Sequence, residues 1–220
     1  MTDTLTDYWV KRDADDFDKI ATLSGRTKAI EKMAKIAMPY LQGANTASIE
    51  LGCGTGLFAE LADARNIIGV DFSASLLAKA KNRMDTVWQK SIFDLDIAAC
   101  SFDNVISMFV IDDYPADKKR DFFRRLAACL KPGGHFFFAA YSPNDEGMGI
   151  LRNTSGSPDN HYEVYLESDS FYKSLLDDCS CTATHVEIFR TQGKFKVESQ
   201  LRDIWREYIL IVAVKGNVID

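Results

Sequence analysis

The order of apolar and polar positions along the chain predicts helices that alternate with buried strands. Apolar residues recur at three- and four-residue steps over 27–41, which predicts an amphipathic helix that ends near Gly43. A shorter helix is expected before it, around Phe17 and Ile20. Short apolar runs follow, which we interpret as strands buried on both faces, at 47–51, 66–70, 86–92, 104–111 and 135–141.

Helical patterns lie between these strands, and they fix the fold class. They cover 56–64, 74–83 and 116–130, and Lys131-Pro132-Gly133-Gly134 closes the last of them because Pro stops a helix and Gly permits a turn. Repeated alternation of strand and helix is typical of a parallel sheet with helices on both faces. The sequence therefore predicts a doubly wound α/β fold.

The last third of the chain has a different pattern. Residues 142–165 are rich in Ser, Pro, Gly, Asn and Asp and exceed the length of an ordinary connection, which predicts a functional loop or lid. A helix is expected at 168–178. Two strands are expected at 182–190 and 207–215, joined by a segment that is partly helical around Leu201 to Trp205.

Composition and charge narrow the function classes. The 220 residues are 46% hydrophobic and 26% charged, as in one ordinary globular domain. Because 32 acidic residues outnumber 26 basic ones, a surface built to neutralise phosphates is disfavoured. No apolar run approaches the roughly 18 residues of a membrane helix, and the acidic N-terminus does not resemble a signal peptide, so a cytoplasmic protein is expected. Five scattered cysteines signal neither a disulfide framework nor a metal site.

A glycine-rich loop at 49–56, IELGCGTG, carries the clearest chemical signal. Gly52, Gly54 and Gly56 stand between a buried strand and a helix, where glycine permits sharp turns and close approach of a ligand. Leu57 occupies the third glycine position of the dinucleotide fingerprint, and Glu50 ahead of the loop would repel a pyrophosphate. An acid there favours a ligand that carries an ammonium and a sulfonium. A tight turn without a ligand is the alternative.

With these residues the chain resembles class I S-adenosylmethionine-dependent methyltransferases of the small-molecule type. ELGCGTG matches the first motif of the family, and Asp71, 19 residues after Gly52, matches the acid that holds the ribose hydroxyls. Asp94 in SIFDLD resembles the acid near the adenine amino group. Residues 102–138 are similar to the family's fourth strand, helix and fifth strand, and the resemblance covers about 46–142.

The resemblance implies a Rossmann-like, seven-stranded mixed sheet with an N-terminal helical lid. It implies a single methyltransferase domain over 1–220, made of a helical cap (1–43), a cofactor-binding core (44–142) and an acceptor-side loop with closing strands (143–220). The implied cofactor is S-adenosylmethionine, which leaves as S-adenosylhomocysteine (SAH). The residues expected to bind it are Tyr8, Trp9, Arg12, Glu50, Gly52, Cys53, Gly54, Gly56, Asp71, Phe72, Phe93, Asp94 and Met108.

Several of these residues have structural alternatives. Asp71 is also suited to cap the helix that begins near Ser73, and Asp94 to a solvated turn. Cys53 fits as a small residue beside the loop. The rings of Tyr8 and Trp9 would attract a sulfonium and Arg12 a carboxylate, or these residues would only anchor the N-terminal segment.

The reaction needs alignment more than acid–base chemistry. A base is required only where the acceptor is a protonated nucleophile such as a hydroxyl or an ammonium. Asp112 and Asp113, at the carboxyl end of the fourth strand, are candidate bases, although an acidic start to the next helix explains them equally. His161 in the long loop is a third candidate, with a solvated loop histidine as the alternative.

The expected function is transfer of a methyl group to an oxygen, nitrogen or carbon of a small-molecule acceptor by in-line displacement. The chain lacks the [DN]-P-P-[YFW] motif of methyltransferases that modify amino groups of bases or glutamine, so nucleic acid is a disfavoured partner, and no membrane partner or metal is expected. A cofactor-binding protein with a regulatory or non-methylating role, or a tRNA or protein methyltransferase, remains as an alternative.

Overall fold

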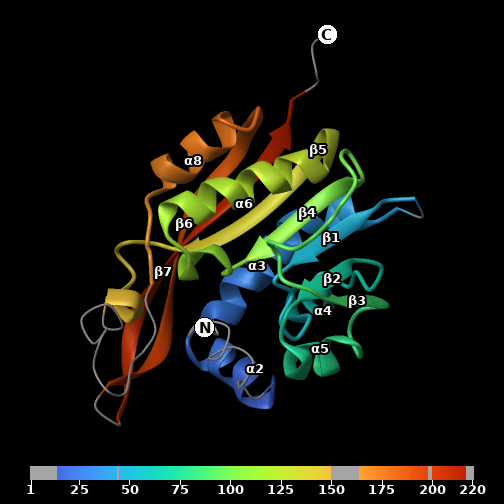
Figure 1. The fold of residues 1–220 in the computed structure, drawn as a ribbon. Helices are drawn as coiled ribbons and strands as arrows, with labels where there is room; N and C mark the ends of the chain where they lie inside the picture. The colour runs from blue at the N-terminus through green and yellow to red at the C-terminus, as the bar shows by residue number, and fades with distance from the viewer. Residues whose placement is uncertain (1–13, 44, 150–163, 198–199, 217–220) are drawn as a thin grey trace, which may run out of the picture.

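A computed structural model describes residues 14–43, 45–149, 164–197 and 200–216. Seven strands form one sheet in the order β3-β2-β1-β4-β5-β7-β6 (Figure 1). β1 to β5 pair in parallel, whereas β7 runs antiparallel to both β5 and β6. The strands are β1 (Ser48–Leu51), β2 (Ile68–Asp71), β3 (Thr86–Gln89), β4 (Phe102–Met108), β5 (Leu130–Tyr141), β6 (Cys181–Val197) and β7 (Gln200–Lys215). The predicted doubly wound, seven-stranded mixed sheet is confirmed.

Helices cover both faces of the sheet, because successive side chains of its central strands point to opposite faces and are apolar on each. One core packs α3, α4 and α5 against side chains such as Ile106 and Leu210, and the other packs α6 and α8 against side chains such as Val105 and Ile211. The helices are α2 (Ala14–Leu23), α3 (Arg26–Leu41), α4 (Leu57–Leu61), α5 (Ala74–Ala80), η1 (Ile111–Asp113), α6 (Ala116–Cys129) and α8 (Asp169–Asp177).

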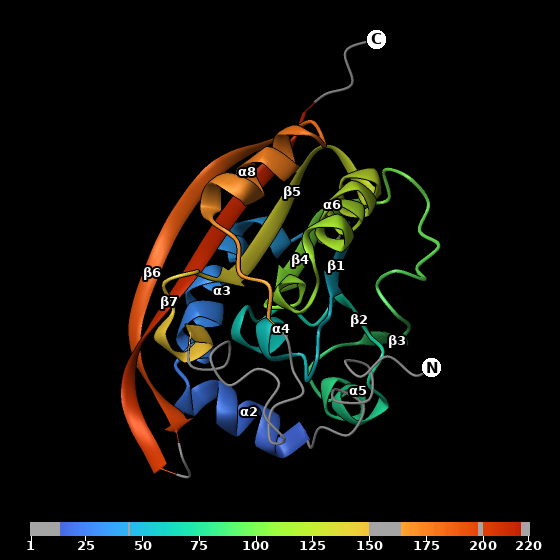
Figure 2. The same cartoon turned by 60° about the vertical axis from the view of Figure 1, so that its left-hand side comes forward.

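The N-terminal helix α2 lies across one end of the sheet. It contacts α5 on one side and β6 on the other, and Figure 2 shows it between α5 and the lower part of the β6–β7 hairpin. In a parallel sheet whose strand order reverses, ligands bind at the carboxyl ends of the strands near the reversal. Here the order reverses between β1 and β4, so α2 lies beside the expected ligand crevice.

The expectation of a partly helical segment around Leu201 to Trp205 is wrong. These residues lie in β7, which pairs with β6 from Val197↔Gln200 to Cys181↔Lys215. Leu201 and Trp205 are four residues apart, and that spacing places two side chains on one side of a helix and also on one face of a strand. Pairing with the long strand β6 makes this segment a strand and not a helix. Both side chains point outward, and Leu201 is 59% and Trp205 54% exposed.

Several boundaries of the predicted strands also differ, and those of β4 and β5 have a local cause in the backbone. β4 ends at Met108 because Phe109 has a left-handed backbone (φ +59°), and its N–H bonds to Ala139 O at 2.8 Å. β5 begins at Leu130 and not at 135, and Gly133 (φ +75°) absorbs an irregularity in pairing with β4. The predicted turn after α6 is therefore the first part of a strand.

Candidate active site

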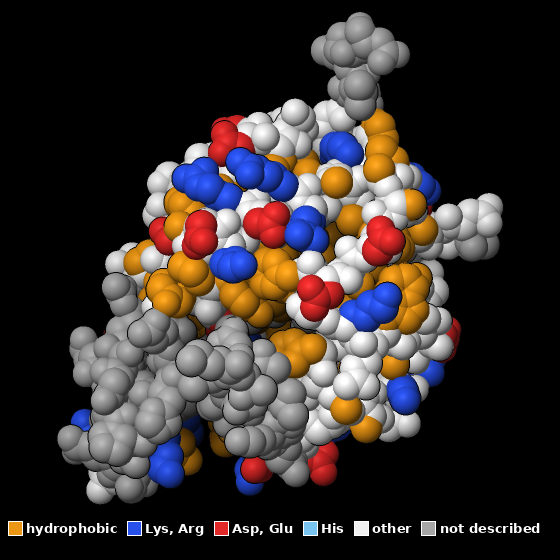
Figure 3. All heavy atoms as spheres, in the orientation of Figure 1, with side chains coloured by type: hydrophobic (Ala, Val, Ile, Leu, Met, Phe, Trp, Pro, Cys, Tyr) orange, Lys and Arg blue, Asp and Glu red, His pale blue; other side chains and the backbone are white. Residues whose placement is uncertain are grey.

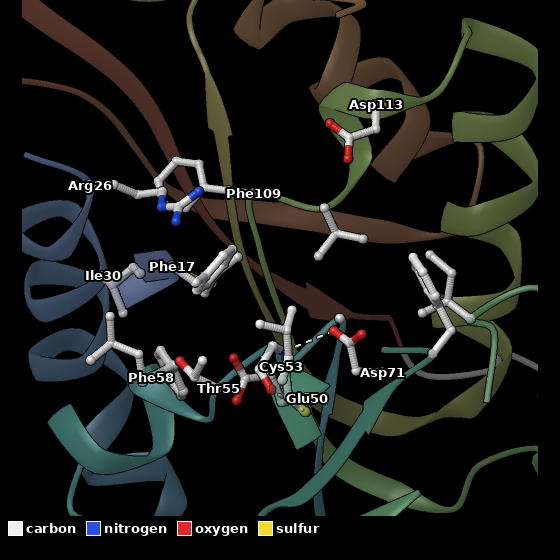
Figure 4. Close-up of a pocket in the computed structure, with 18 of the residues that line it drawn as sticks. Phe17, Arg26, Ile30, Glu50, Cys53, Thr55, Phe58, Asp71, Phe109 and Asp113 are labelled. Carbon is white, nitrogen blue, oxygen red and sulfur yellow. Dashed lines mark hydrogen bonds between the residues drawn. The ribbon is translucent and has the colours of Figure 1, made fainter. Parts of the chain in front are cut away.

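A pocket lies at the carboxyl ends of β1, β2 and β4, where three parts of the chain meet (Figure 4). The glycine-rich loop forms one side, the segments after β2 and β4 form a second, and α2 and α3 form a third. The lining residues are Phe17, Arg26, Ile30, Glu50, Gly52, Cys53, Gly54, Thr55, Leu57, Phe58, Asp71, Phe72, Leu76, Ile92, Met108, Phe109, Val110, Asp113 and Tyr114.

Gly52 brings the loop against the segment that follows β4. Its backbone is left-handed (φ +72°), its N–H bonds to Val70 O at 2.8 Å, and a Cβ there would lie 2.2 Å from Val110 Cγ2. Any other residue would therefore push the two segments apart. Gly56 (φ +76°) does not line the pocket, but its Cα approaches Met84 and Ala80, which lets α4 pack against α5.

Asp71 ties the loop to the next helix. Its Oδ2 accepts the Gly54 N–H and its Oδ1 accepts the Ser73 N–H, both at 2.9 Å. Burial raises the pKa of Asp71, and these backbone hydrogen bonds oppose the shift. The carboxylate thus bonds to the start of α5, the capping role considered as an alternative for Asp71, and it also lines the pocket. The Phe72 N–H also lowers the pKa of this carboxylate, and acceptor capacity remains for a ligand.

Glu50 is a buried acid with one oxygen that accepts no hydrogen bond from the described residues. It is 2% exposed, and its Oε2 has no hydrogen-bond partner in the part of the chain that the structure describes. Burial raises the pKa of Glu50 well above its usual range, and the nearby Asp71 adds to the shift. A buried acceptor without a partner costs free energy, and a donor or a cation in the pocket would remove that cost.

The helical side of the pocket combines a cation with aromatic rings. The Arg26 guanidinium lies 4.6 Å from the centre of the Phe17 ring, and Figure 4 shows Arg26 beside Phe109 above the pocket. The Phe109 ring packs in turn against Tyr141 and Tyr208, with ring centres 5.0 and 5.2 Å away. Arg26 thus supplies a positive group in the pocket, for which the sequence had suggested Arg12.

The two adjacent acids after β4 have different surroundings. Asp113 lines the pocket with Tyr114. Asp112 lies outside the pocket lining and is 1% exposed, and its carboxylate accepts the Tyr141 N–H at 3.2 Å and the Tyr172 hydroxyl at 3.5 Å. Burial raises the pKa of Asp112 to about 8. Of the two candidate bases, only Asp113 faces the pocket.

The remaining predicted residues are distributed as follows. Cys53, Phe72 and Met108 line the pocket. Phe93 packs its ring against Tyr114, with centres 5.0 Å apart, and Asp94 is exposed on the segment after β3. Neither lines the pocket, whereas Ile92 does. Tyr8, Trp9, Arg12 and His161 lie outside the described residues.

Sequence reasoning missed Phe17, Arg26 and Ile30. They belong to α2 and α3. The apolar pattern indicated burial of Ile30 without saying against what, and it did not include Arg26. The one local signal at Arg26 is the preceding Gly25, whose left-handed backbone (φ +79°) starts α3 and turns Arg26 toward the loop. Among the described residues, no group of three or more His, Cys, Asp and Glu could hold a metal ion. The described helices include none with the length and apolar character to cross a membrane.

Comparison with known proteins gives the following similarities. A family model described as a methyltransferase domain matches residues 49–138. The ubiquinone biosynthesis O-methyltransferase of Coxiella burnetii is 29% identical over 133 residues, which cover 55% of this chain and 56% of that protein. The 18S rRNA (guanine(1575)-N(7))-methyltransferase of Saccharomyces cerevisiae is 29% identical over 142 residues, 56% of this chain and 52% of that protein. The chain spans about half the length of these curated relatives.

A solved structure matches almost the whole chain. Magnesium protoporphyrin IX methyltransferase from Synechocystis PCC 6803, crystallised with bound SAH, superposes with a TM-score of 0.69 at 17% sequence identity. The match covers 97% of this chain and 99% of that chain, so the same fold extends over the N-terminal helices and the closing hairpin.

Proposed function

The chain carries a methyltransferase domain of the class I, S-adenosylmethionine-dependent type, and from this premise we propose that it transfers a methyl group from S-adenosylmethionine to a small-molecule acceptor. The observation that carries the proposal is the pocket itself. It places a glycine loop, an unsatisfied buried carboxyl of Glu50 and the carboxylate of Asp71 on adjacent parallel strands.

The residues of the pocket fit the cofactor part by part. Glu50 Oε2 would accept the ammonium of the methionine moiety, which supplies its missing partner. Arg26, on the opposite wall, would pair with the carboxylate of that moiety. Asp71 would accept the ribose hydroxyls with its remaining lone pairs, while Phe72 and Leu76 border the space for the base. Asp94 stays a prediction for the adenine amino group.

S-adenosylmethionine supplies a methyl bonded to a positive sulfur. The chain's own contribution is to align the acceptor with that methyl and to exclude water, and positioning of this kind can supply most of a rate enhancement. Phe17, Phe109 and Tyr114 give this end of the pocket apolar walls. Asp113 is the pocket carboxylate placed to hold an acceptor amine or to take a proton from a hydroxyl.

A small-molecule acceptor is favoured over nucleic acid by the charge of the protein. The formal net charge is −6, and the face over α6 and α8 shows acidic and basic side chains interspersed (Figure 3). Pairs such as Arg120–Asp178 and Arg125–Asp121 neutralise one another there. A phosphate-binding surface would instead gather one sign of charge. The relatives include both an O-methyltransferase and an rRNA methyltransferase, so the acceptor class needs a direct test.

Titration calorimetry tests the cofactor, with S-adenosylmethionine, SAH and NAD injected in parallel. We expect micromolar binding of the first two and no heat with NAD. Binding of NAD alone would overturn the proposal. Transfer of labelled methyl from S-adenosylmethionine is then compared between a small-molecule extract and total RNA, and preferential labelling of RNA would overturn the small-molecule acceptor.

A further inference from the structure

Helix α2 is bonded to the glycine-rich loop through one side chain. Asp18 Oδ1 accepts the Thr55 hydroxyl at 2.5 Å, although the two residues are 37 positions apart. Thr55 is fully buried and lines the pocket between Gly54 and Gly56. The contact therefore joins α2 to the loop that would carry the cofactor.

Two cations hold the other oxygen of the same carboxylate. Asp18 Oδ2 lies 2.8 Å from Arg83 Nη1 and 3.1 Å from Lys79 Nζ, at the end of α5 and just beyond it. Arg83 also donates to the Thr55 carbonyl at 3.2 Å. Burial alone would raise the pKa of Asp18, but the hydrogen bonds from Thr55, Lys79 and Arg83 lower it. Asp18 is thus charged and saturated in this arrangement.

The opposite end of α2 is held more rigidly. Ser24 O accepts the Tyr208 hydroxyl at 3.1 Å and Arg206 Nη1 at 3.2 Å, both from β7. A Cβ on Gly193 of β6 would lie 2.3 Å from the same carbonyl oxygen. These contacts hold the elbow between α2 and α3, Ser24 and Gly25, against the β6–β7 hairpin. A displacement of α2 would therefore pivot at the elbow.

Phe17 makes α2 part of the pocket wall. A Cβ on Gly54 would lie 3.5 Å from the Phe17 ring, so the ring packs directly over the loop. Phe17 precedes Asp18 in the chain, and Arg26 stacks on the same ring from α3. Phe17 and Asp18 are adjacent on α2, so a movement of α2 that carried the Phe17 ring away from the loop would also break the Asp18–Thr55 bond.

We propose that Asp18 is a positioning residue that fastens α2 to Thr55 and thereby sets the rate at which the cofactor and its product exchange. This inference rests on the proposed function, because it takes S-adenosylmethionine and SAH as the ligands of the pocket. It assigns Asp18 no contact with the reacting atoms. The ion pairs to Lys79 and Arg83 make the fastening sensitive to ionic strength, since screening weakens partly exposed pairs.

The test measures SAH dissociation by stopped-flow displacement with excess S-adenosylmethionine. We expect Asp18→Ala to raise the dissociation rate constant about tenfold, the change that corresponds to about 1.4 kcal/mol. Added salt should raise the rate constant of the wild-type protein and leave that of Asp18→Ala nearly unchanged. Thr55→Val should raise it as well, and the double variant should exceed the larger single effect by less than twofold.

Asp15→Asn is the matched control. Asp15 is on the same helix and pairs with Lys79 at 2.8 Å, but its side chain is 91% exposed. We expect its dissociation rate constant within twofold of wild type. Far-ultraviolet circular dichroism and thermal unfolding check that each variant folds, and Asp18→Asn, which keeps the shape of the side chain, replaces Asp18→Ala if the latter does not.

The outcomes separate the two proposals. Failure of the wild-type protein to bind SAH would overturn the proposed function, and this inference with it. Binding of SAH with a dissociation rate constant that neither Asp18 variant changes by more than twofold would overturn the fastening alone. An equal acceleration in Asp15→Asn would overturn it too, because a general loss of negative charge on α2 would then explain the result.

Discussion

Gly52 and Gly133 make a matched pair for testing the close approach that shapes the pocket. Both have a positive φ, +72° and +75°. A Cβ on Gly52 would lie 2.2 Å from Val110 Cγ2, whereas a Cβ on Gly133 would have no heavy atom within 4 Å. Substitution of each by alanine therefore places a side chain at a positive φ, and the collision with Val110 is added at Gly52 alone.

The expected magnitudes follow from that difference. A non-glycine residue in the left-handed region costs about 1–2 kcal/mol, and the loss of unfolded-state freedom returns about 0.4–1 kcal/mol. Gly133→Ala should therefore lower the free energy of unfolding by at most about 1.6 kcal/mol. At Gly52 the new methyl must gain more than 1 Å from Val110 to reach carbon contact distance, and overpacking of this kind adds about 1–3 kcal/mol. Gly52→Ala should lower it by about 2–4 kcal/mol.

Urea unfolding followed by circular dichroism measures both variants against the wild-type protein. Calorimetry with SAH measures the second consequence, since Gly52→Ala displaces the loop from Val110 and should weaken binding at least tenfold, while Gly133→Ala should leave it within twofold. Equal destabilisation by the two substitutions would refute the argument from close approach. So would a Gly52→Ala variant with wild-type affinity for SAH.

Three further predictions use buried charges. Burial raises the pKa of the Glu50 carboxyl well above its usual range, so Glu50→Gln should raise the melting temperature at pH 8. Calorimetry should show at least tenfold weaker SAH binding by the same variant. Burial raises the pKa of Asp112 from 3.8 in the unfolded chain to about 8, so between these values the carboxyl is protonated in the folded state and ionised in the unfolded state. The free energy of unfolding of the wild-type protein should therefore fall, relative to Asp112→Asn, by up to about 1.4 kcal/mol per pH unit between pH 5 and 7. Parallel pH profiles of the two proteins would contradict this prediction. Arg206→Met should cost about 3–5 kcal/mol in urea unfolding because it leaves the buried Asp145 without its cation at 2.8 Å, and adding Asp145→Asn should restore part of that loss; no recovery would contradict the pairing.

The sheet and its glycine loop could be predicted because their signals are local. Buried strands, the helices between them and the spacing of Gly52, Gly54 and Asp71 are all properties of short stretches. Their order along the chain then determines the strand order through the rules for parallel connections. The sequence accordingly predicted the loop, Glu50 and Asp71 on one side of the pocket.

The rest depended on contacts between distant segments. Arg26 and Phe17 reach the pocket because the hairpin holds the elbow at Ser24, which is more than 180 positions from its partners. The adjacent residues Asp112 and Asp113 differ because they are consecutive in the short helix η1, which follows the left-handed turn at Phe109: Asp112 bonds to Tyr141 and Tyr172, whereas Asp113 lines the pocket. No periodicity in the sequence reports such a turn.

The position of β7 has a consequence for how the molecule assembles. β7 follows β6 in sequence, yet it inserts between β5 and β6, and its Arg206 and Tyr208 donate hydrogen bonds to the carbonyl of Ser24, which precedes α3. Contacts of such sequence separation form late, because the chain between them must first be ordered. During vectorial synthesis the glycine loop emerges long before the strand that fixes the opposite wall. We therefore expect a nascent chain that has reached β5 to lack the contacts of Arg206 and Tyr208 that hold Ser24, and to bind the ligand only after β7 has joined the sheet.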